Sequence, residues 1–503
     1  MAVPKVVGIE TELGIMVRGT SEWNPVSASS LLINAYVGGI TGTLDSRSAS
    51  VAWDFIDETP GADARDLMPL EFALPPEVET HLVNSVLTNG ARYYVDHAHP
   101  EISTPECRDA LSLVCFDRAA ELIAIDSMTR ANAVLPEGQE MVLYKDNTDR
   151  KGNAYGCHEN FLLDRATPFG QIVLAATTHF VSRQIFTGAG KVGSELPGVG
   201  SARVPYQLTQ RAEHFEEEVG LETTLKRPIV NTRDEPHADS QRYRRLHVIV
   251  GDANMSQIAT FIKIGTTSVL LAMLEDGMLT QIPLADPVPS MHQVSHDLTL
   301  RRPILLADGT SATALEIQAD LLEQAERWAE SRGLESVGGE TVGRLILDRW
   351  RHLLEGLERD PMSLASEIDW VAKKRILDGF CERHSCDWED PRLRALDLQY
   401  HDLRPGKGLA ARAGLETLVD EADARRATFE PPTDTRAYFR GRCLQKFPDQ
   451  VVAANWDSIV FDVGEDPLRR VPMLEPTRGT VEHVGALLDS SDTVAELLEK
   501  LGA

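Results

Sequence analysis

Cysteine is scarce in this sequence of 503 residues, and its spacing shows no disulfide pattern. The six cysteines are Cys107, Cys115, Cys157, Cys381, Cys386 and Cys443. Small secreted domains held by disulfides carry many more cysteines for their length, so that class is excluded. The run Cys381-x-x-His384-x-Cys386 has the residue types of a zinc site. No second ligand pair stands near it in the sequence, so we expect no metal there.

A basic surplus and long apolar runs are also lacking. The chain carries 50 Lys and Arg against 77 Asp and Glu, a formal net charge of −27. A surface this acidic repels nucleic acid and anionic membrane, which argues against both as partners. The start MAVPKVVGIETELG has no apolar signal-peptide core, and we expect no stretch long and apolar enough to span a bilayer. A cytoplasmic enzyme is the simplest class.

The chain has enough apolar residues, 42%, to build a sizeable core. Its length fits several domains, or one large catalytic domain with an appendage. The stiff run Glu430-Pro-Pro-Thr-Asp434 predicts a linker between a catalytic domain, residues 1–429, and a small C-terminal domain, residues 435–503. Predicted strands and helices mix without a regular βαβ alternation, which favours an α+β fold.

Hydrophobic periodicity predicts the individual elements. We expect strands at residues 4–17 and 246–250, a strand-to-helix segment at 258–273, and helices at 28–37, 167–185, 314–332, 342–359 and 492–501. Asn89-Gly90 lies between two strand-like runs and predicts a hairpin with a two-residue type I′ turn.

Residues 38–75 are rich in Gly, Ser, Thr and Asp and predict a long flexible loop. Loops of this length inside a compact domain are uncommon and are often functional. Trp53 and Phe55, near its middle, could dock over a neighbouring site as a lid does. On this interpretation, replacing residues 41–66 with a short Gly-Ser linker leaves thermal stability nearly unchanged.

Glu10 and Glu12 alternate onto one face of the first predicted strand. Two carboxylates on a buried face need a cation, and hard oxygen ligands suit magnesium. The alternative is a half-exposed strand whose carboxylates point to water.

Arg92, Tyr94 and Asp96 share a face of a second predicted strand, followed by Glu101 and Thr104. A cation, a phenol and a carboxylate on one face are unfavourable in an apolar core, but they are common side chains of functional sites. The alternative is a hairpin with one solvent-exposed face.

Further candidates for a site are His158, His247, Trp456 and a set of arginines that includes Arg203 and Arg227. A lone histidine near an apolar run is usually a core residue whose ring nitrogens have hydrogen-bond partners. Two such histidines are stronger evidence for a metal site when the sequence also holds Glu-rich strands that need a cation. Arginine binds carboxylate and phosphate bidentately, although surface ion pairs explain any one of these arginines equally well. Trp456 could stack on a base or belong to the core.

Several of these segments together resemble one family. They are Gly8-Ile-Glu10-Thr-Glu12, Ala91-Arg-Tyr-Tyr-Val-Asp96, His99-Pro-Glu101, Thr104-Pro-Glu106, Asn231-Thr-Arg-Asp-Glu-Pro-His-Ala-Asp239 and Asn455-Trp456-Asp457. Their order and number resemble the family of the Pup ligase and the Pup deamidase/depupylase. The likeness extends over nearly the whole chain.

The resemblance implies a glutamine-synthetase-like domain, with a mostly antiparallel curved sheet backed by helices, and a small C-terminal domain. It implies ATP and magnesium as cofactors, and Pup, pupylated proteins and the bacterial proteasome pathway as the functional context. In the roles that it implies, Asp96 is catalytic and Arg92, Thr104 and Trp456 contact ATP. Magnesium ligands would be Glu10, Tyr94 and Glu101, with Glu12, His158 and His247 in the same shell. Arg203 and Arg227 would hold the C-terminal carboxylate of Pup.

The two branches of that family differ in reaction, and this chain resembles the hydrolytic one. The insertion at residues 38–75 is similar to the loop typical of the depupylase, and Asp96-His-Ala-His99 departs from the ligase pattern. We therefore expect a hydrolase that cleaves the Pup isopeptide bond and deamidates the C-terminal glutamine of Pup. The alternative is a ligase that joins the terminal glutamate of Pup to lysine. Whether Asp96 attacks the carbonyl or activates a water stays open.

Overall fold

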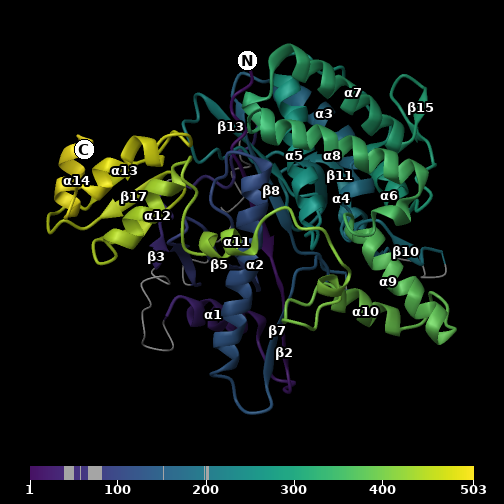
Figure 1. Cartoon of the computed structure of the whole chain (residues 1–503), viewed down its shortest axis with the longest axis horizontal. Helices are drawn as coiled ribbons and strands as arrows, with labels where there is room; N and C mark the ends of the chain where they lie inside the picture. The colour runs from purple at the N-terminus through teal and green to yellow at the C-terminus, as the bar shows by residue number, and fades with distance from the viewer. Residues whose placement is uncertain are drawn as a thin grey trace.

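The computed structural model describes residues 1–38, 50–56, 58–65, 82–150, 152–196, 199 and 203–502. Within these residues the architecture is α+β, as predicted, and its centre is a ten-stranded sheet (Figure 1). All neighbouring strands in this sheet are antiparallel, apart from β3 and β16, which are parallel.

The strands of the large sheet are, in spatial order, β13 (Tyr243–Val248), β8 (Cys157–Asp164), β1 (Val7–Glu12), β6 (His99–Ser103), β5 (Arg92–Asp96), β4 (Asn84–Leu87), β3 (Ser50–Trp53), β16 (Val451–Ala454), β17 (Ser458–Phe461) and β18 (Arg469–Pro472). Four two-stranded pairs lie outside it: β2 (Gly14–Arg18) with β7 (Glu140–Tyr144), β9 (Lys191–Val192) with β10 (Tyr206–Gln207), β11 (Phe215–Gly220) with β12 (Arg227–Asn231), and β14 (Ile304–Leu305) with β15 (Ser311–Ala312).

The helices are α1 (Pro25–Tyr36), α2 (Ala110–Asn132), α3 (Phe169–Ser182), α4 (Gln184–Thr187), α5 (Gln257–Glu275), α6 (Pro287–His296), α7 (Ala314–Arg332), α8 (Gly339–Arg359), α9 (Asp369–His384), α10 (Arg392–Tyr400), α11 (Glu421–Ala427), α12 (Ala437–Lys446), α13 (Val481–Asp489) and α14 (Val494–Leu501). In Figure 1 the C-terminal helices α12–α14 gather at one end of the molecule, and the layer of α3, α5, α7 and α8 lies at the other.

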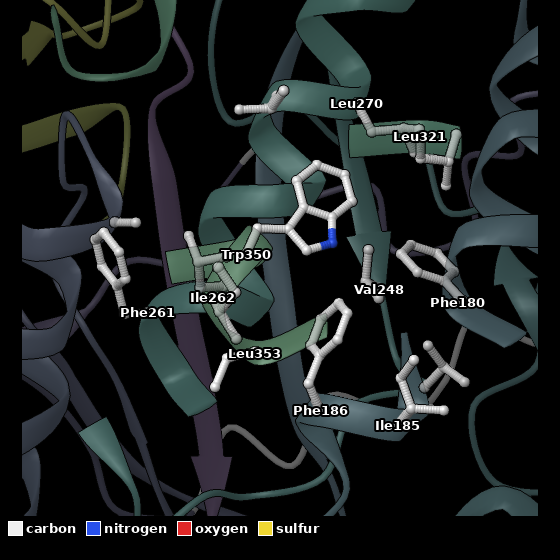
Figure 2. Packing of buried hydrophobic residues seen from close by; sticks show 14 of the residues in the cluster. Phe180, Ile185, Phe186, Val248, Phe261, Ile262, Leu270, Leu321, Trp350 and Leu353 are labelled. Carbon is white, nitrogen blue, oxygen red and sulfur yellow. The ribbon is translucent and has the colours of Figure 1, made fainter. Parts of the chain in front are cut away.

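Apolar side chains of the sheet pack on these helices in separate clusters. The largest cluster joins β8 and β13 to α3, α5, α7 and α8, and Trp350 lies at its centre (Figure 2). A second cluster joins β5 and β6 to α1 and α2. Because strand side chains alternate, the opposite face of these strands is left for polar residues. That face carries the candidate site.

Several predicted elements are confirmed and some are corrected. The predicted helix at 314–332 coincides with α7, and the C-terminal helix is α14. The predicted strand at 4–17 is two strands, because the chain leaves the large sheet at Leu13 and β2 pairs with β7.

The segment at 258–273 is helical throughout, as α5. By length and composition α5 could cross a membrane, contrary to our expectation, but 94% of its apolar window is buried inside the protein.

The hairpin of β4 and β5 is confirmed, but its turn is longer than predicted. Val86 pairs with Arg92, and the Gly90 amide donates to the Leu87 carbonyl at 2.9 Å. Gly90 then adopts a φ of +82°, which glycine takes without strain. Asn89 is buried instead of exposed, because its amide nitrogen donates to the Ala427 carbonyl. The tertiary contact selects a three-residue connection.

The prediction of a loop over residues 38–75 is wrong for the part that forms β3. This strand pairs with β4 on one side and β16 on the other, and Trp53 is only 4% exposed. Beyond it, the Ala64 amide donates to the Thr232 carbonyl at 2.8 Å, and Ala62 accepts from the Asp234 amide at 2.9 Å. Residues 39–49, 57 and 66–81 lie outside the described residues.

The C-terminal part is joined to the rest by β3 and by a buried ion pair. Glu106 accepts from Arg436 Nε at 2.6 Å and from Arg440 Nη2 at 2.5 Å. Burial opposes ionisation of Glu106, but the two arginines outweigh it and lower its pKa to about 2. The division into domains at about residue 430 stays a prediction, since the large sheet runs through both parts.

Because of β3, replacing residues 41–66 with a short Gly-Ser linker is expected to lower the melting temperature clearly. Loss of a buried tryptophan alone costs about 3–5 kcal/mol. A replacement restricted to residues 41–48 keeps β3 and serves as the control. Equal melting temperatures of the longer replacement and the wild type, measured by calorimetry, would contradict the packing role of β3.

Glu106→Gln is expected to lower the free energy of unfolding at pH 7 by about 3 kcal/mol, from 1.36 kcal/mol per pKa unit. A lowered folded-state pKa contributes stability above the unfolded pKa of about 4.3, and this contribution is lost as pH falls toward 2. The wild type should therefore lose stability between about pH 5 and 2, and the variant should lose less. Urea titrations at several pH values measure both, and parallel pH profiles would refute the assignment.

Candidate active site

The strand register brings the predicted site residues onto one face of the large sheet. Glu10 on β1 lies opposite His158 on β8, and Glu12 lies opposite Glu101 on β6. Glu101 in turn lies opposite Tyr94 on β5. Residues opposite each other in an antiparallel pair point to the same side, so four strands present their polar side chains together.

One group consists of Glu10, His158 and His247. Their ligand atoms lie within 4.8 Å of one another. The Glu10 carboxylate is 3.5 Å from His158 Nδ1 and 3.9 Å from His247 Nε2. Burial opposes ionisation of Glu10, but the bond with His158 and the charge of Arg245 outweigh it and hold the pKa of Glu10 below its usual range.

A hydrogen bond with Asn231 fixes the orientation of the His247 ring. Its Nδ1 lies 3.2 Å from Asn231 Oδ1, while the amide nitrogen of Asn231 donates to the Leu221 carbonyl. Nδ1 therefore carries the proton and Nε2 directs a lone pair toward Glu10. Burial lowers the pKa of His247 well below its ordinary value, so the ring is neutral at pH 7. A neutral imidazole held in this way is a suitable metal ligand.

The second group consists of three carboxylates, Glu12, Asp96 and Glu101, again within 4.8 Å. Glu101 is 2% exposed. Burial and then the charges of Asp96, Glu12 and Glu10 raise the pKa of Glu101 well above its usual range. Burial acts in the same direction on Glu12, but the bond with His99 and the Gly156 amide outweigh it and lower the pKa of Glu12 to about 2.

Three further side chains border this second group. Tyr94 is buried and its hydroxyl donates to Glu101, which opposes the rise in the pKa of that carboxyl. His97 Nδ1 lies 2.7 Å from Asp96 Oδ2, and His97 has a φ of +52°. His99 lies opposite Asp96 in the register, stacks on Tyr155 at 4.4 Å and approaches Glu12 at 3.5 Å.

These two groups suit divalent cations by their donor atoms. Hard carboxylate oxygens are the ligands that magnesium prefers, and the group of Glu12, Asp96 and Glu101 offers only such oxygens. Three close, mostly buried carboxylates repel one another unless a cation lies among them. Burial first, and that repulsion second, raise the pKa of Glu101, so the donor set fits a divalent cation.

A cavity adjoins Glu10 of the first group, and its lining extends to the C-terminal part. Its lining includes Glu10, Thr104, Arg245, Arg436 and Trp456. Thr104 is buried and its hydroxyl accepts from the Ile9 amide at 3.1 Å. The cavity thus brings two predicted nucleotide contacts, Thr104 and Trp456, beside the first metal group.

Arg92 pairs in register with Ser103, which lines the cavity, and its side chain contacts two aromatic rings. Its guanidinium carbon is 3.9 Å from the centre of the Trp53 ring and 4.0 Å from that of Tyr94. The Trp456 ring contacts Trp53 edge to face at 5.3 Å. Trp53 therefore contacts both Arg92 and Trp456 and connects the two side chains.

The two predicted substrate arginines differ in position. Arg227 is half-buried, donates to the Ala154 carbonyl at 2.8 Å and interacts with the charge of Glu12. Arg203 is exposed in the connection from β9 to β10. None of the described hydrogen bonds or ion pairs links Arg203 to the site.

Three residues of the site were not assigned roles from the sequence. Asn160 donates to Glu10 at 2.9 Å, and Arg245 donates to Asn160 at 2.9 Å. Both alternate with predicted histidines on their strands, and His99 alternates with Glu101 on β6, so period-two spacing could have found all three. Trp53 was expected to dock over the site from a flexible loop, but the structure packs it in β3, where it is 4% exposed.

Known proteins similar to this chain were found by sequence. The family model described as Pup-ligase protein matches residues 5–460. A protein named Depupylase from Acidothermus cellulolyticus is 51% identical over 507 residues, which cover 99% of each chain. One named Pup deamidase/depupylase from Mycobacterium tuberculosis is 45% identical over 514 residues, again 99% of each chain. A Pup--protein ligase from Kineococcus radiotolerans is 40% identical over 417 residues, 81% of this chain and 90% of the other.

Solved structures confirm the predicted fold class. The complex of the prokaryotic ubiquitin-like protein Pup with its ligase PafA matches with a TM-score of 0.80 and 31% identity, covering 99% of this chain and 94% of that one. The Pup ligase PafA in complex with ADP matches with a TM-score of 0.73 and 35% identity, covering 81% of this chain and 89% of that one.

Glu101→Gln tests whether the carboxylate cluster binds a cation. The change removes a negative charge from a crowded anionic group, so the melting temperature in EDTA should stay equal or rise. A ligand that binds only the folded state stabilises it, so the wild type should gain melting temperature in millimolar magnesium and the variant should gain less. Exposed Glu340→Gln on α8 is the control. An equal gain in wild type and Glu101→Gln would make the cluster purely structural.

Proposed function

The chain belongs to the Pup-ligase family, and from this premise we propose that it is a hydrolase that removes Pup from proteins. It cleaves the isopeptide bond between Pup and substrate lysines and deamidates the C-terminal glutamine of Pup. The observation that carries the proposal is the pair of relatives named for depupylation, which match at higher identity than the ligase and over 99% of the chain. We place the enzyme in the cytoplasm, in the bacterial proteasome pathway.

The proposed cofactors are ATP and magnesium. The related ligase that binds ADP supports a nucleotide in the cavity lined by Thr104 and Trp456. Arg92, Thr104 and Trp456 would contact the nucleotide. Glu10, His158 and His247 would hold one metal, and Glu12, Glu101 and Tyr94 would lie around another. Bound magnesium and phosphate would supply positive charge and polar groups where negative charge develops on the scissile carbonyl.

Asp96 is the proposed catalytic residue. It lies at the end of β5, where its side chain is more exposed than those of Glu12 and Glu101, and a substrate carbonyl can reach it. His97 holds one of its carboxylate oxygens, which orients the other. Asp96 attacks the carbonyl itself or takes a proton from the attacking water. Amide hydrolysis is favourable in water, so this reaction has no thermodynamic need for ATP turnover.

Arg227 and Arg203 are the proposed contacts for the carboxylate of the Pup C-terminal residue. Arg227 has the stronger support, because it lies close to Glu12 at the edge of the site. An arginine fork binds a carboxylate bidentately and would orient the residue whose side-chain amide is cleaved.

One assay separates the proposed hydrolase from a ligase. Purified protein is incubated with ATP, magnesium and a purified Pup conjugate, and in parallel with free Pup and an unmodified substrate protein. We expect the conjugate to disappear and free Pup to appear on a gel. Conjugates that instead accumulate from free Pup would establish the ligase, and no change in either mixture would refute both activities.

Asp96→Asn keeps the size of the side chain and removes its charge. We expect isopeptide cleavage to fall by at least about 100-fold, the lower range for a positioned acid–base group. Affinity for ATP, measured by calorimetry, should change little because Asp96 is assigned to the chemistry. A variant that keeps a large share of wild-type cleavage would remove Asp96 from the catalytic role.

A further inference from the structure

The guanidinium of Arg92 contacts two aromatic rings. Its carbon lies 3.9 Å from the centre of the Trp53 ring and 4.0 Å from the centre of the Tyr94 ring. Arg92 Nε also donates to Asn84 Oδ1 at 2.9 Å. A planar cation that contacts two π faces and a hydrogen-bond acceptor keeps one orientation, which an ammonium on a flexible chain would not.

Trp53 is itself fixed by its surroundings. It is 4% exposed, and its Nε1 donates to Glu58 Oε1 at 2.6 Å. Its strand, β3, is held between β4 and β16 by backbone pairing. Since β16 leads directly into Trp456, the same pairing fixes the distance between the two tryptophans, which meet edge to face at 5.3 Å.

Trp53 therefore touches two residues proposed to contact the nucleotide: Trp456, which lines the cavity, and Arg92, whose register partner Ser103 lines it. Trp53 itself is not among the lining residues. A residue in this place acts on the ligand through its neighbours. Side chains already held in their binding orientation lose less freedom when the ligand binds, which strengthens binding.

We infer that Trp53 is a positioning residue of the nucleotide site, which holds Arg92 beside Tyr94 and supports Trp456 through an edge-to-face contact. The inference rests on the proposed function. It assigns a binding role to β3, which lies in a segment whose composition predicts only a loop.

The test compares two substitutions of Trp53 by calorimetric titration with Mg–ATP. Trp53→Leu removes the π face over Arg92, and the dissociation constant should rise about 5- to 30-fold, the range of a desolvated cation–π contact. Trp53→Phe keeps a ring over Arg92 and should stay within about twofold of the wild type. At saturating ATP, the kcat for Pup-conjugate cleavage by Trp53→Leu should recover most of the wild-type value.

Two controls separate positioning from general loss of packing. Phe461 on β17 belongs to the same apolar cluster as Trp53. Phe461→Leu should therefore lower the melting temperature without changing the affinity for Mg–ATP. In an Arg92→Lys background, Trp53→Leu should cause little further loss, because residues that act through one contact are not additive.

The outcomes are distinct. Wild-type affinity in Trp53→Leu, or equal losses in Trp53→Leu and Phe461→Leu, would overturn the positioning role while leaving the proposed function intact. Additive losses from Trp53→Leu and Arg92→Lys would overturn the route through Arg92. A wild-type protein that does not bind Mg–ATP would refute the nucleotide cofactor, and the positioning role with it.

Discussion

Mutual repulsion among buried carboxylates is the constraint to which the rest of this site responds. Glu12, Asp96 and Glu101 offer oxygens within 4.8 Å of one another, and Glu101 is almost fully buried. Such a group is stable only if it is protonated or if cations neutralise it. The chain responds in two ways. Histidines and a backbone amide surround Glu10 and Glu12, whereas Glu101 meets other carboxylates and a phenol. The centre of the face is thus left deficient in positive charge, which suits binding of a divalent cation.

The sheet supplies the rigidity that this arrangement needs. Five neighbouring strands, β13, β8, β1, β6 and β5, carry the candidate ligands at fixed register, and a one-residue slip of any strand would turn its candidate ligands to the apolar face. The helices behind that face bury large side chains such as Trp350 and Phe180, so packing on the apolar side holds the register (Figure 2). Sites on rigid elements keep their geometry better than sites on loops.

The C-terminal part completes the site instead of standing apart from it. The strand β16 extends the sheet through β3, and Glu106 binds Arg436 and Arg440 of that part. These contacts bring Trp456 to the cavity beside Glu10 and Thr104. A nucleotide in this cavity would then contact residues from both parts of the chain.

The sequence alone determined the fold class, about half of the described helices, including α7, α8 and α14, and the candidate residues on the polar face of the sheet. Strand alternation placed Glu10 with Glu12 and Arg92 with Tyr94 and Asp96, because a period of two is a local property of the chain. Local pattern could not decide which strands become neighbours. The pairing of β1 with both β6 and β8 sorts the predicted ligands into two groups, and it also brings in His99, Asn160 and Arg245. Composition was misleading for Ser50–Trp53, where a polar, glycine-rich segment contains a strand. That strand is stabilised by pairing with β4 and β16, which come from distant parts of the chain, and only the tertiary structure supplies those partners.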